Sequence, residues 1–145
     1  MNSERLLESV KKHEGYRNKV YLDTLGKRTV GVGHLCVEDF WMDGVEYEEE
    51  FLMDILKKDL QEAIRGAKEL MEEHDCADID ERAEEIIIEM VFQLGRTGVK
   101  KFRNMWKALA EHNYIGASFE MLDSKWAKQT PNRAKDMADQ MKACV

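Results

Sequence analysis

Two acidic side chains and one hydroxyl side chain stand close together near the start of the sequence. Eight residues separate Glu14 from Asp23, and five separate Asp23 from Thr29. Two carboxyl groups that face a common gap are what the hydrolysis of a glycosidic bond requires. One must be protonated to donate to the leaving oxygen, and the other must be ionised to orient a water molecule. Because the chain has 29 acidic residues, this spacing alone is weak support for catalysis.

The elements around these residues decide whether the two carboxyl groups can meet. A polar N-cap and an apolar stripe predict a first helix that ends at Gly15. Between residues 19 and 32, short runs of strand formers alternate with turn residues, which predicts a small hairpin. Glu14 would then end a helix and Asp23 would stand at the start of the hairpin. The turn between them can therefore fold one carboxyl toward the other across a cleft.

The rest of the chain is predicted to be mostly helical. Residues 36–46 show no sustained period and are expected to form a loop. Between residues 46 and 65, apolar residues repeat at intervals of three and four, which predicts a long amphipathic helix that stops at Gly66. The further predicted elements are a short helix and acidic loop at 67–79, a helix from about 79 to Gly95, helices near 100–111 and 115–124, and a last helix from Pro131 to about 143. The predicted fold class is α+β, dominated by helices.

The composition is typical of a soluble globular protein that holds no metal. The chain of 145 residues fits one domain, with 43% hydrophobic and 35% charged residues. Its three cysteines lie far apart and form no C-x-x-C pair, so we expect reduced thiols rather than disulfides or a zinc site. The N-terminus has neither a basic nor an apolar signal region, and no segment approaches the roughly 18 apolar residues of a membrane span. We expect no signal peptide and no membrane insertion.

The net charge of −7 is distributed unevenly along the chain. Residues 1–35 carry seven basic and four acidic side chains, residues 36–91 carry five and twenty, and residues 92–145 carry ten and five. The acidic excess is therefore confined to the middle block. The candidate chemistry lies in the basic flanking segments, whose local charge would favour an anionic substrate.

Two blocks of sequence carry a further pattern. The first contains residues 13–15 (HEG), 20–24 (VYLDT) and 29–35 (TVGVGHL), and the second contains residues 90–95 (MVFQLG), 97–99 (TGV), 124–126 (SKW) and 129–135 (QTPNRAK). Together they closely resemble the phage-type lysozyme family. The resemblance covers nearly the whole chain and is loosest at residues 36–58 and 67–85. The spacing of the glutamate, aspartate and threonine is specific to this family, so catalysis becomes the expected function.

The resemblance implies a lysozyme-like fold with two lobes in a single domain, residues 1–145. The small β-hairpin lobe would comprise about residues 14–55, the larger helical lobe about residues 1–13 and 66–145, and the helix that joins them about residues 46–66. The expected reaction is cleavage of the β-1,4 bond between N-acetylmuramic acid and N-acetylglucosamine in peptidoglycan. Glu14 would be the general acid. Asp23 and Thr29 would position water on the opposite face of the sugar, which makes the enzyme inverting.

The resemblance also implies binding residues and partners. The substrate-binding positions would be Leu35, Phe92, Gln93, Phe102, Met105, Glu120, Thr130 and Arg133. Of these, Met105 and Glu120 stand where the resemblance places a serine and an asparagine that contact saccharide, so substrate details should differ there. His34 and Asp59 would form a structural ion pair. No metal or organic cofactor is implied. The expected partner is the peptidoglycan glycan strand, with no nucleic acid, and the enzyme would be a monomer held in the host cytoplasm until release to the cell wall in the periplasm.

Two alternatives remain open. A lytic transglycosylase also uses a glutamate, but the substrate's own hydroxyl attacks, so it does not require Asp23 and Thr29 to hold water. A catalytically silent lysozyme-like module would instead bind glycan or assemble into a phage structure. The presence of all three candidate side chains favours the hydrolase over both. A 1,6-anhydro end on the product would distinguish a lytic transglycosylase from the hydrolase. Loss of turbidity of permeabilised Gram-negative cells would distinguish the hydrolase from a silent module.

Overall fold

The computed structural model describes all 145 residues of the chain. It contains seven helices and one three-stranded antiparallel sheet, which confirms the predicted α+β, mostly helical fold class. The chain divides into two compact units. We call residues 3–62 the N-terminal unit, and residues 1–2 with 63–145 the C-terminal unit. None of the helices has the length and apolar character needed to cross a membrane.

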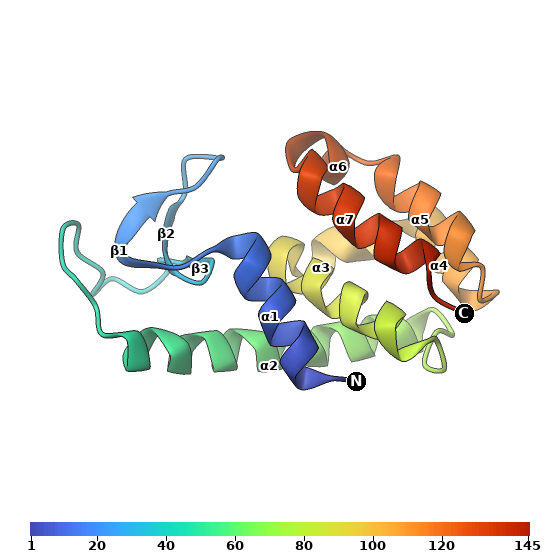
Figure 1. Cartoon of the computed structure of the whole chain (residues 1–145), viewed down its shortest axis with the longest axis horizontal. Helices are drawn as coiled ribbons and strands as arrows, with labels where there is room; N and C mark the ends of the chain where they lie inside the picture. Colours follow the sequence, from blue (N-terminus) through green and yellow to red (C-terminus); the bar gives the residue numbers. More distant parts are fainter. The chain divides into compact units, whose positions relative to one another are not determined.

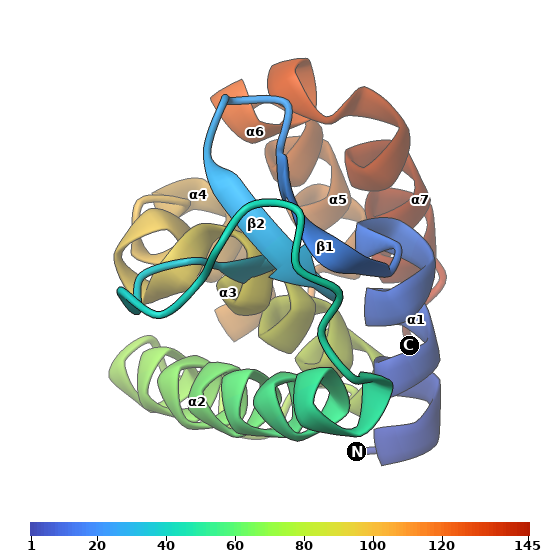
Figure 2. The same ribbon diagram turned by 90° about the vertical axis from the view of Figure 1, so that its left-hand side faces the viewer.

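The N-terminal unit contains the sheet. Its elements are helix α1 (Ser3–Glu14), strands β1 (Arg17–Leu22), β2 (Arg28–Gly31) and β3 (His34–Leu35), and the first part of helix α2 (Glu49–Glu73). Strand β2 lies in the centre of the sheet, between β1 and β3 (Figures 1 and 2). The predicted hairpin corresponds to β1 and β2. Strand β3 was not predicted, because two residues are too few to show an alternating pattern.

Local features explain where the elements of this unit begin and end. Gly15 ends α1, as predicted: its φ is +74°, and its N–H donates to the carbonyl of Lys11 at 2.9 Å. Residues 36–48 form a loop, also as predicted, although α2 begins at residue 49 rather than 46. One core cluster of the unit consists of Val30, Trp41 and Leu52, which connect the sheet, the loop and α2.

Helix α2 corrects the prediction for Gly66. The helix passes through this residue and continues to Glu73, so the predicted end at residue 66 and the predicted short helix at residues 67–79 are wrong. A Cβ atom at Gly66 would lie only 3.3 Å from Cγ1 of Val91 on the neighbouring helix. The glycine therefore permits close packing of two helices and does not act as a cap.

The C-terminal unit is entirely helical. After the end of α2 it contains α3 (Glu81–Lys100), α4 (Arg103–Ala110), α5 (Tyr114–Leu122), α6 (Lys125–Gln129) and α7 (Pro131–Lys142). Gly95, with φ of 78° and ψ of 162°, interrupts α3, so the predicted break is present although helical structure resumes after it. The short helix α6 was not predicted. Helices α5 and α7 lie side by side (Figure 1). Met121 on α5 and Met137 and Met141 on α7 are buried in the core.

Candidate active site

Glu14 is the last residue of α1, and its carboxyl group lies directly against the backbone of Gly33. A Cβ atom at Gly33 would come within 2.7 Å of Cδ and 2.9 Å of Oε1 of Glu14. Gly33 also has a φ of +68°, which favours glycine. This glycine occupies the turn between β2 and β3, so the turn fixes one side of the carboxyl group. Gly33 is a site residue that the sequence analysis did not single out.

Asp23 follows β1 and is held by the turn that it begins. Its Oδ1 accepts hydrogen bonds from the backbone N–H groups of Leu25 at 2.9 Å and Lys27 at 2.8 Å. Its own N–H donates to the carbonyl of Lys27 at 2.9 Å. Because both donors bind Oδ1, the second carboxylate oxygen retains its lone pairs for another donor, such as water. The side chain is half-buried, so water can reach it.

Thr29 lies on the central strand β2 and is only 3% exposed. Its hydroxyl donates to the carbonyl of Lys27 at 3.0 Å, which fixes the direction of the O–H bond and leaves the oxygen lone pairs as acceptors. In the sheet, Thr29 stands opposite Tyr21 of β1 and Leu35 of β3. Directly opposed residues share one face of a sheet, so these three side chains project from the same face.

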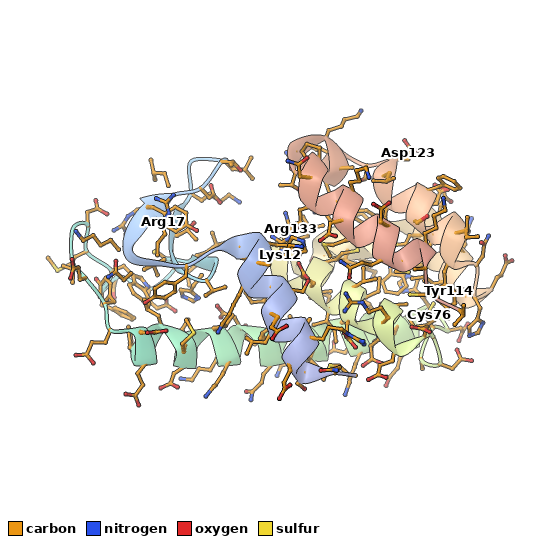
Figure 3. All side chains as sticks on the ribbon, viewed as in Figure 1. Lys12, Arg17, Cys76, Tyr114, Asp123 and Arg133 are labelled. Carbon is orange, nitrogen blue, oxygen red and sulfur yellow. The ribbon has the colours of Figure 1, made fainter.

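Tyr21 is a second site residue that the sequence analysis missed. Burial raises the pKa of its hydroxyl, and the negative charges of Glu14 and Asp23 raise this pKa further, against the opposing charge of Arg17. The Arg17 side chain is labelled in Figure 3. Its guanidinium lies over the Tyr21 ring, 4.6 Å from the centroid. Both acids therefore act electrostatically on one phenol. A sequence signal was present, since Tyr21 stands only two residues before Asp23 in the same segment.

His34 directly follows Gly33, and each of its ring nitrogens forms a hydrogen bond with a carboxylate. Its Nδ1 lies 2.7 Å from Oδ2 of Asp59, and its Nε2 lies 2.9 Å from Oε1 of Glu38. The hydrogen bond with Asp59 raises the pKa of His34 to about 9, with a smaller contribution from Glu38 and an opposing effect of burial. The imidazole is therefore charged at neutral pH. The sequence analysis anticipated Asp59 as a partner but not Glu38, which lies in the irregular loop.

Three of the predicted binding positions lie near a polar network in the C-terminal unit. The indole N–H of Trp126 donates to Oε1 of Gln93 at 2.8 Å, and Nε2 of Gln93 donates to the hydroxyl of Thr130 at 3.4 Å. The Thr130 hydroxyl in turn donates to the carbonyl of Trp126 at 3.1 Å. Phe92, which precedes Gln93, is half-buried on α3. The network fixes the orientation of the Gln93 amide, and Trp126 is a member that the predicted site omitted.

Arg133 lies on α7 and forms a buried ion pair. Its Nη2 is 3.1 Å from Oε2 of Glu89 on α3, and the two side chains are 9% and 3% exposed (Figure 3). A buried charge is expensive unless it is paired, and here the two charges compensate each other where α3 packs against α7. Within its own unit, the partner of Arg133 is Glu89, which the sequence analysis did not consider.

A cavity of about 580 Å³ lies in the C-terminal unit, between the end of α3 and helices α4, α5 and α6. Three of the predicted binding residues line it, namely Phe102, Met105 and Glu120. Met105 is fully buried and forms part of the wall, whereas Glu120 is half-buried. The wall also contains Trp126, whose ring lies 6.1 Å from that of Phe102, and the basic side chains Lys101, Arg103 and Lys125. Leu35, by contrast, lies on the sheet of the N-terminal unit and is exposed.

The thiols of the chain are free and contribute no ligand cluster. Burial raises the pKa values of Cys76 and Cys144 to about 11, so both are protonated and weakly nucleophilic at neutral pH. The structure contains no group of three or more His, Cys, Asp or Glu side chains that could hold a metal ion.

The N-terminal unit thus has a glutamate at the end of a helix, an aspartate directly after strand β1 and a threonine on the central strand, and its two carboxyl groups are of the kind that a glycoside hydrolase uses. Residues 11–142 match the model of the phage lysozyme family, so the chain belongs to that family and is a lysozyme.

The chain is also similar to individual proteins. It is 26% identical to probable T4-type lysozyme 2 of Dictyostelium discoideum, over 89% of this chain and 88% of that protein. It is 30% identical to the pre-baseplate central spike protein Gp5 of Enterobacteria phage T4, over 89% of this chain but 26% of the spike protein. It is 26% identical to the peptidoglycan hydrolase gp36 of Pseudomonas phage phiKMV, over 88% of this chain and 14% of that hydrolase. The chain thus spans most of the Dictyostelium protein and a small part of each phage protein.

Proposed function

We propose that this lysozyme hydrolyses the β-1,4 bond between N-acetylmuramic acid and N-acetylglucosamine in peptidoglycan and inverts the anomeric configuration. Glu14 is the general acid, and Asp23 and Thr29 position the attacking water. The observation that carries this assignment is the fixed placement of the two carboxyl groups. Glu14 packs on the Gly33 turn, and Asp23 is held through one oxygen by two backbone amides.

The environment of each group supports its proposed role. Glu14 donates its proton to the leaving oxygen while the glycosidic bond breaks. The second oxygen of Asp23 accepts a hydrogen bond from water and then takes up its proton as the water attacks the anomeric carbon. The Thr29 hydroxyl, whose own proton is donated to the carbonyl of Lys27, accepts a hydrogen bond from the other O–H of the water, which stays bonded to oxygen in the product. An inverting enzyme needs about 6.5–9.5 Å between its carboxyl groups to leave room for this water.

The C-terminal unit supplies the proposed binding surface. The cavity beside Phe102, Met105 and Glu120 would hold part of the peptidoglycan strand, and its mixture of basic, acidic and aromatic side chains suits a ligand with both sugar and charged groups. Phe92, Gln93, Thr130 and Arg133 on the adjoining helices, and Leu35 on β3, would complete the binding residues. We propose that the enzyme acts on the cell wall as a monomer.

Digestion of purified peptidoglycan tests the proposal. We expect Glu14→Gln to reduce the release of reducing sugar by at least about 10²-fold with little change in Tm, because glutamine cannot donate the proton. Asp23→Asn should be nearly as severe. The matched controls are Glu8→Gln on the exposed side of α1 and Asp39→Asn in the loop, which should retain activity.

The nature of the product separates the mechanisms. Proton NMR of fresh digests should show the α-anomer first, since an inverting enzyme converts a β bond into an α product. A first-formed β-anomer or a 1,6-anhydro end would refute the assigned roles of Asp23 and Thr29. Absence of any reducing sugar with the native chain would identify a catalytically silent module and refute the proposal as a whole.

A further inference from the structure

The loop between β3 and α2 exposes large apolar side chains. Phe40 is 51% exposed, Met42 is 64% exposed, and Phe51 in the first turn of α2 is 42% exposed. The ring centroids of Phe40 and Phe51 are 6.3 Å apart. Tyr47 links Met42 to this pair, because its hydroxyl accepts a hydrogen bond from the Met42 N–H at 2.8 Å and its ring lies 6.3 Å from that of Phe51. We call Phe40, Met42 and Phe51 the apolar patch.

The loop beneath the apolar patch is held in place by a buried residue. Trp41 is 4% exposed, and its ring lies 4.8 Å from that of Phe40 and 5.8 Å from that of Phe51. Its indole N–H donates to Glu38 at 2.7 Å, and the same carboxylate oxygen bonds His34 at 2.9 Å. These contacts order the loop in the free protein. A partner would therefore not pay the entropy of ordering it.

Acidic side chains adjoin the apolar patch along the sequence. Residues 36–56 contain eight Asp and Glu and no Lys or Arg. Three of these carboxylates pair with cations of the same unit: Glu38 with His34, Asp43 with Arg28, and Glu46 with Lys19. Asp39, Glu48, Glu49 and Glu50 face solvent. The positive N-terminal end of α2 accounts for Glu49 and Glu50, but it does not account for Asp39 in the loop.

We propose that the apolar patch docks a basic segment of a partner polypeptide. An apolar side chain of the partner packs against Phe40 and Phe51, and its Lys or Arg side chains face Asp39 and Glu48. Exposed apolar surface with a polar rim is typical of protein-interaction sites. A rim of one charge sign selects a partner of the opposite sign and speeds the encounter. The same rim repels anionic lipid headgroups and glycan carboxylates, which excludes them as occupants.

A second exposed apolar surface lacks this one-sided charge. Ile115, Phe119 and Leu122 form an exposed stripe on α5. There, the Nζ of Lys142 lies 5.7 Å from the centroid of the Phe119 ring, while Glu120 stands next to that residue in the helix. The mixed signs specify no partner charge, so the stripe provides a control surface of similar apolar character.

Fluorescence anisotropy with a synthetic peptide tests the proposal. The probe is a labelled amphipathic helix of about 18 residues built from Leu and Lys, which presents an apolar face between basic side chains. We expect the intact protein to bind it with a Kd in the micromolar range. Phe40→Ser with Met42→Ser, and separately Glu48→Lys with Glu49→Lys, should each weaken binding by about tenfold or more. Binding should also weaken as salt is added.

Matched variants and probes give the decisive comparison. Ile115→Ser with Phe119→Ser removes the control stripe, and Glu72→Lys with Glu111→Lys makes the same charge change in the C-terminal unit. Both should keep the native Kd within about threefold, a difference of less than 1 kcal/mol. A peptide with Glu in place of every Lys, and vesicles of phosphatidylglycerol, should not bind. Circular dichroism verifies that each variant is folded.

Several results would overturn the proposal. These are equal losses in patch and control variants, binding of the Glu peptide, capture by the vesicles, or concentration-dependent dimerisation that only the patch substitutions abolish. The proposal is independent of catalysis, so Glu14→Gln should bind the Leu–Lys peptide like the native protein. If the proposed hydrolysis failed, the measured binding of the Leu–Lys peptide would therefore still test the docking proposal.

Discussion

Substitution of Gly33 by alanine should displace the carboxyl group of Glu14, the proposed general acid, and should lower the stability of the fold only moderately. The new Cβ would lie 2.7 Å from Cδ of Glu14, whereas ordinary contacts begin at 3.4 Å, so the carboxyl group must move by about 0.7 Å. A misplacement of about 1 Å at a reacting group costs on the order of 100-fold in rate. The φ of +68° adds about 1–2 kcal/mol of backbone strain for a residue with a Cβ. For a chain of this size, that strain corresponds to a Tm lowered by about 2–8 °C.

A second glycine isolates the two effects. Gly44 also has a positive φ, +80°, but a Cβ there would meet nothing within 4 Å. Gly44→Ala should therefore lower Tm by a similar amount and keep full activity, whereas Gly33→Ala should lose about 10- to 100-fold in the rate of reducing-sugar release. Both variants are measured below their Tm, with calorimetry and the same peptidoglycan substrate. Equal activities for the two variants would refute the argument that the Gly33 turn positions Glu14.

Three further predictions follow from buried or paired groups. The folded pKa of His34 is raised to about 9, so its contribution to the free energy of unfolding should be fully present below pH 6.5 and lost as the pH rises through 9. In urea unfolding, Asp59→Asn should therefore show a weaker dependence of this free energy on pH in this range. An unchanged pH dependence would exclude the His34–Asp59 pair as its cause. Glu89→Gln should lower the free energy of unfolding, because it removes the carboxylate charge that pairs with the buried Arg133 guanidinium, and an unchanged free energy of unfolding in urea titration would contradict this. Thr29→Val should reduce kcat by about 10²-fold while Thr29→Ser retains most of it, since serine keeps the hydroxyl; equal rates would remove that hydroxyl from the mechanism.

Glycines show how far the fold could be predicted from the sequence. Gly15 and Gly95 stand where helical patterns stop, and both adopt a positive φ that interrupts the helix. Gly66 gives the same sequence signal, yet α2 passes through it, because the absence of a side chain is used there for contact with Val91. A sequence records that a residue is glycine but not whether its backbone freedom or its small size is needed. That distinction depends on tertiary packing.

In the candidate site, too, some residues could be predicted from the sequence and others could not. The spacing of Glu14, Asp23 and Thr29 and the family resemblance were sufficient to propose these residues. The groups that hold them were not visible, because the amides that bind Asp23 are backbone atoms and carry no residue signature. Glu38 was equally hidden, since its contact with His34 depends on the path of an irregular loop. Tyr21 was within reach, because it stands only two residues before Asp23 in the same segment.

The proposed catalytic groups and Gly33, which contacts the proposed acid, all lie within residues 14–33. Most of the proposed binding residues lie between residues 92 and 133, in the other unit. On this assignment, the chemistry and most of the recognition are encoded in different parts of the sequence. Substitutions between residues 92 and 133 would then change substrate preference without replacing a proposed catalytic group. Recombination between relatives at a point within α2 would exchange substrate preference as a block and leave the acid, the aspartate and the threonine in their original context.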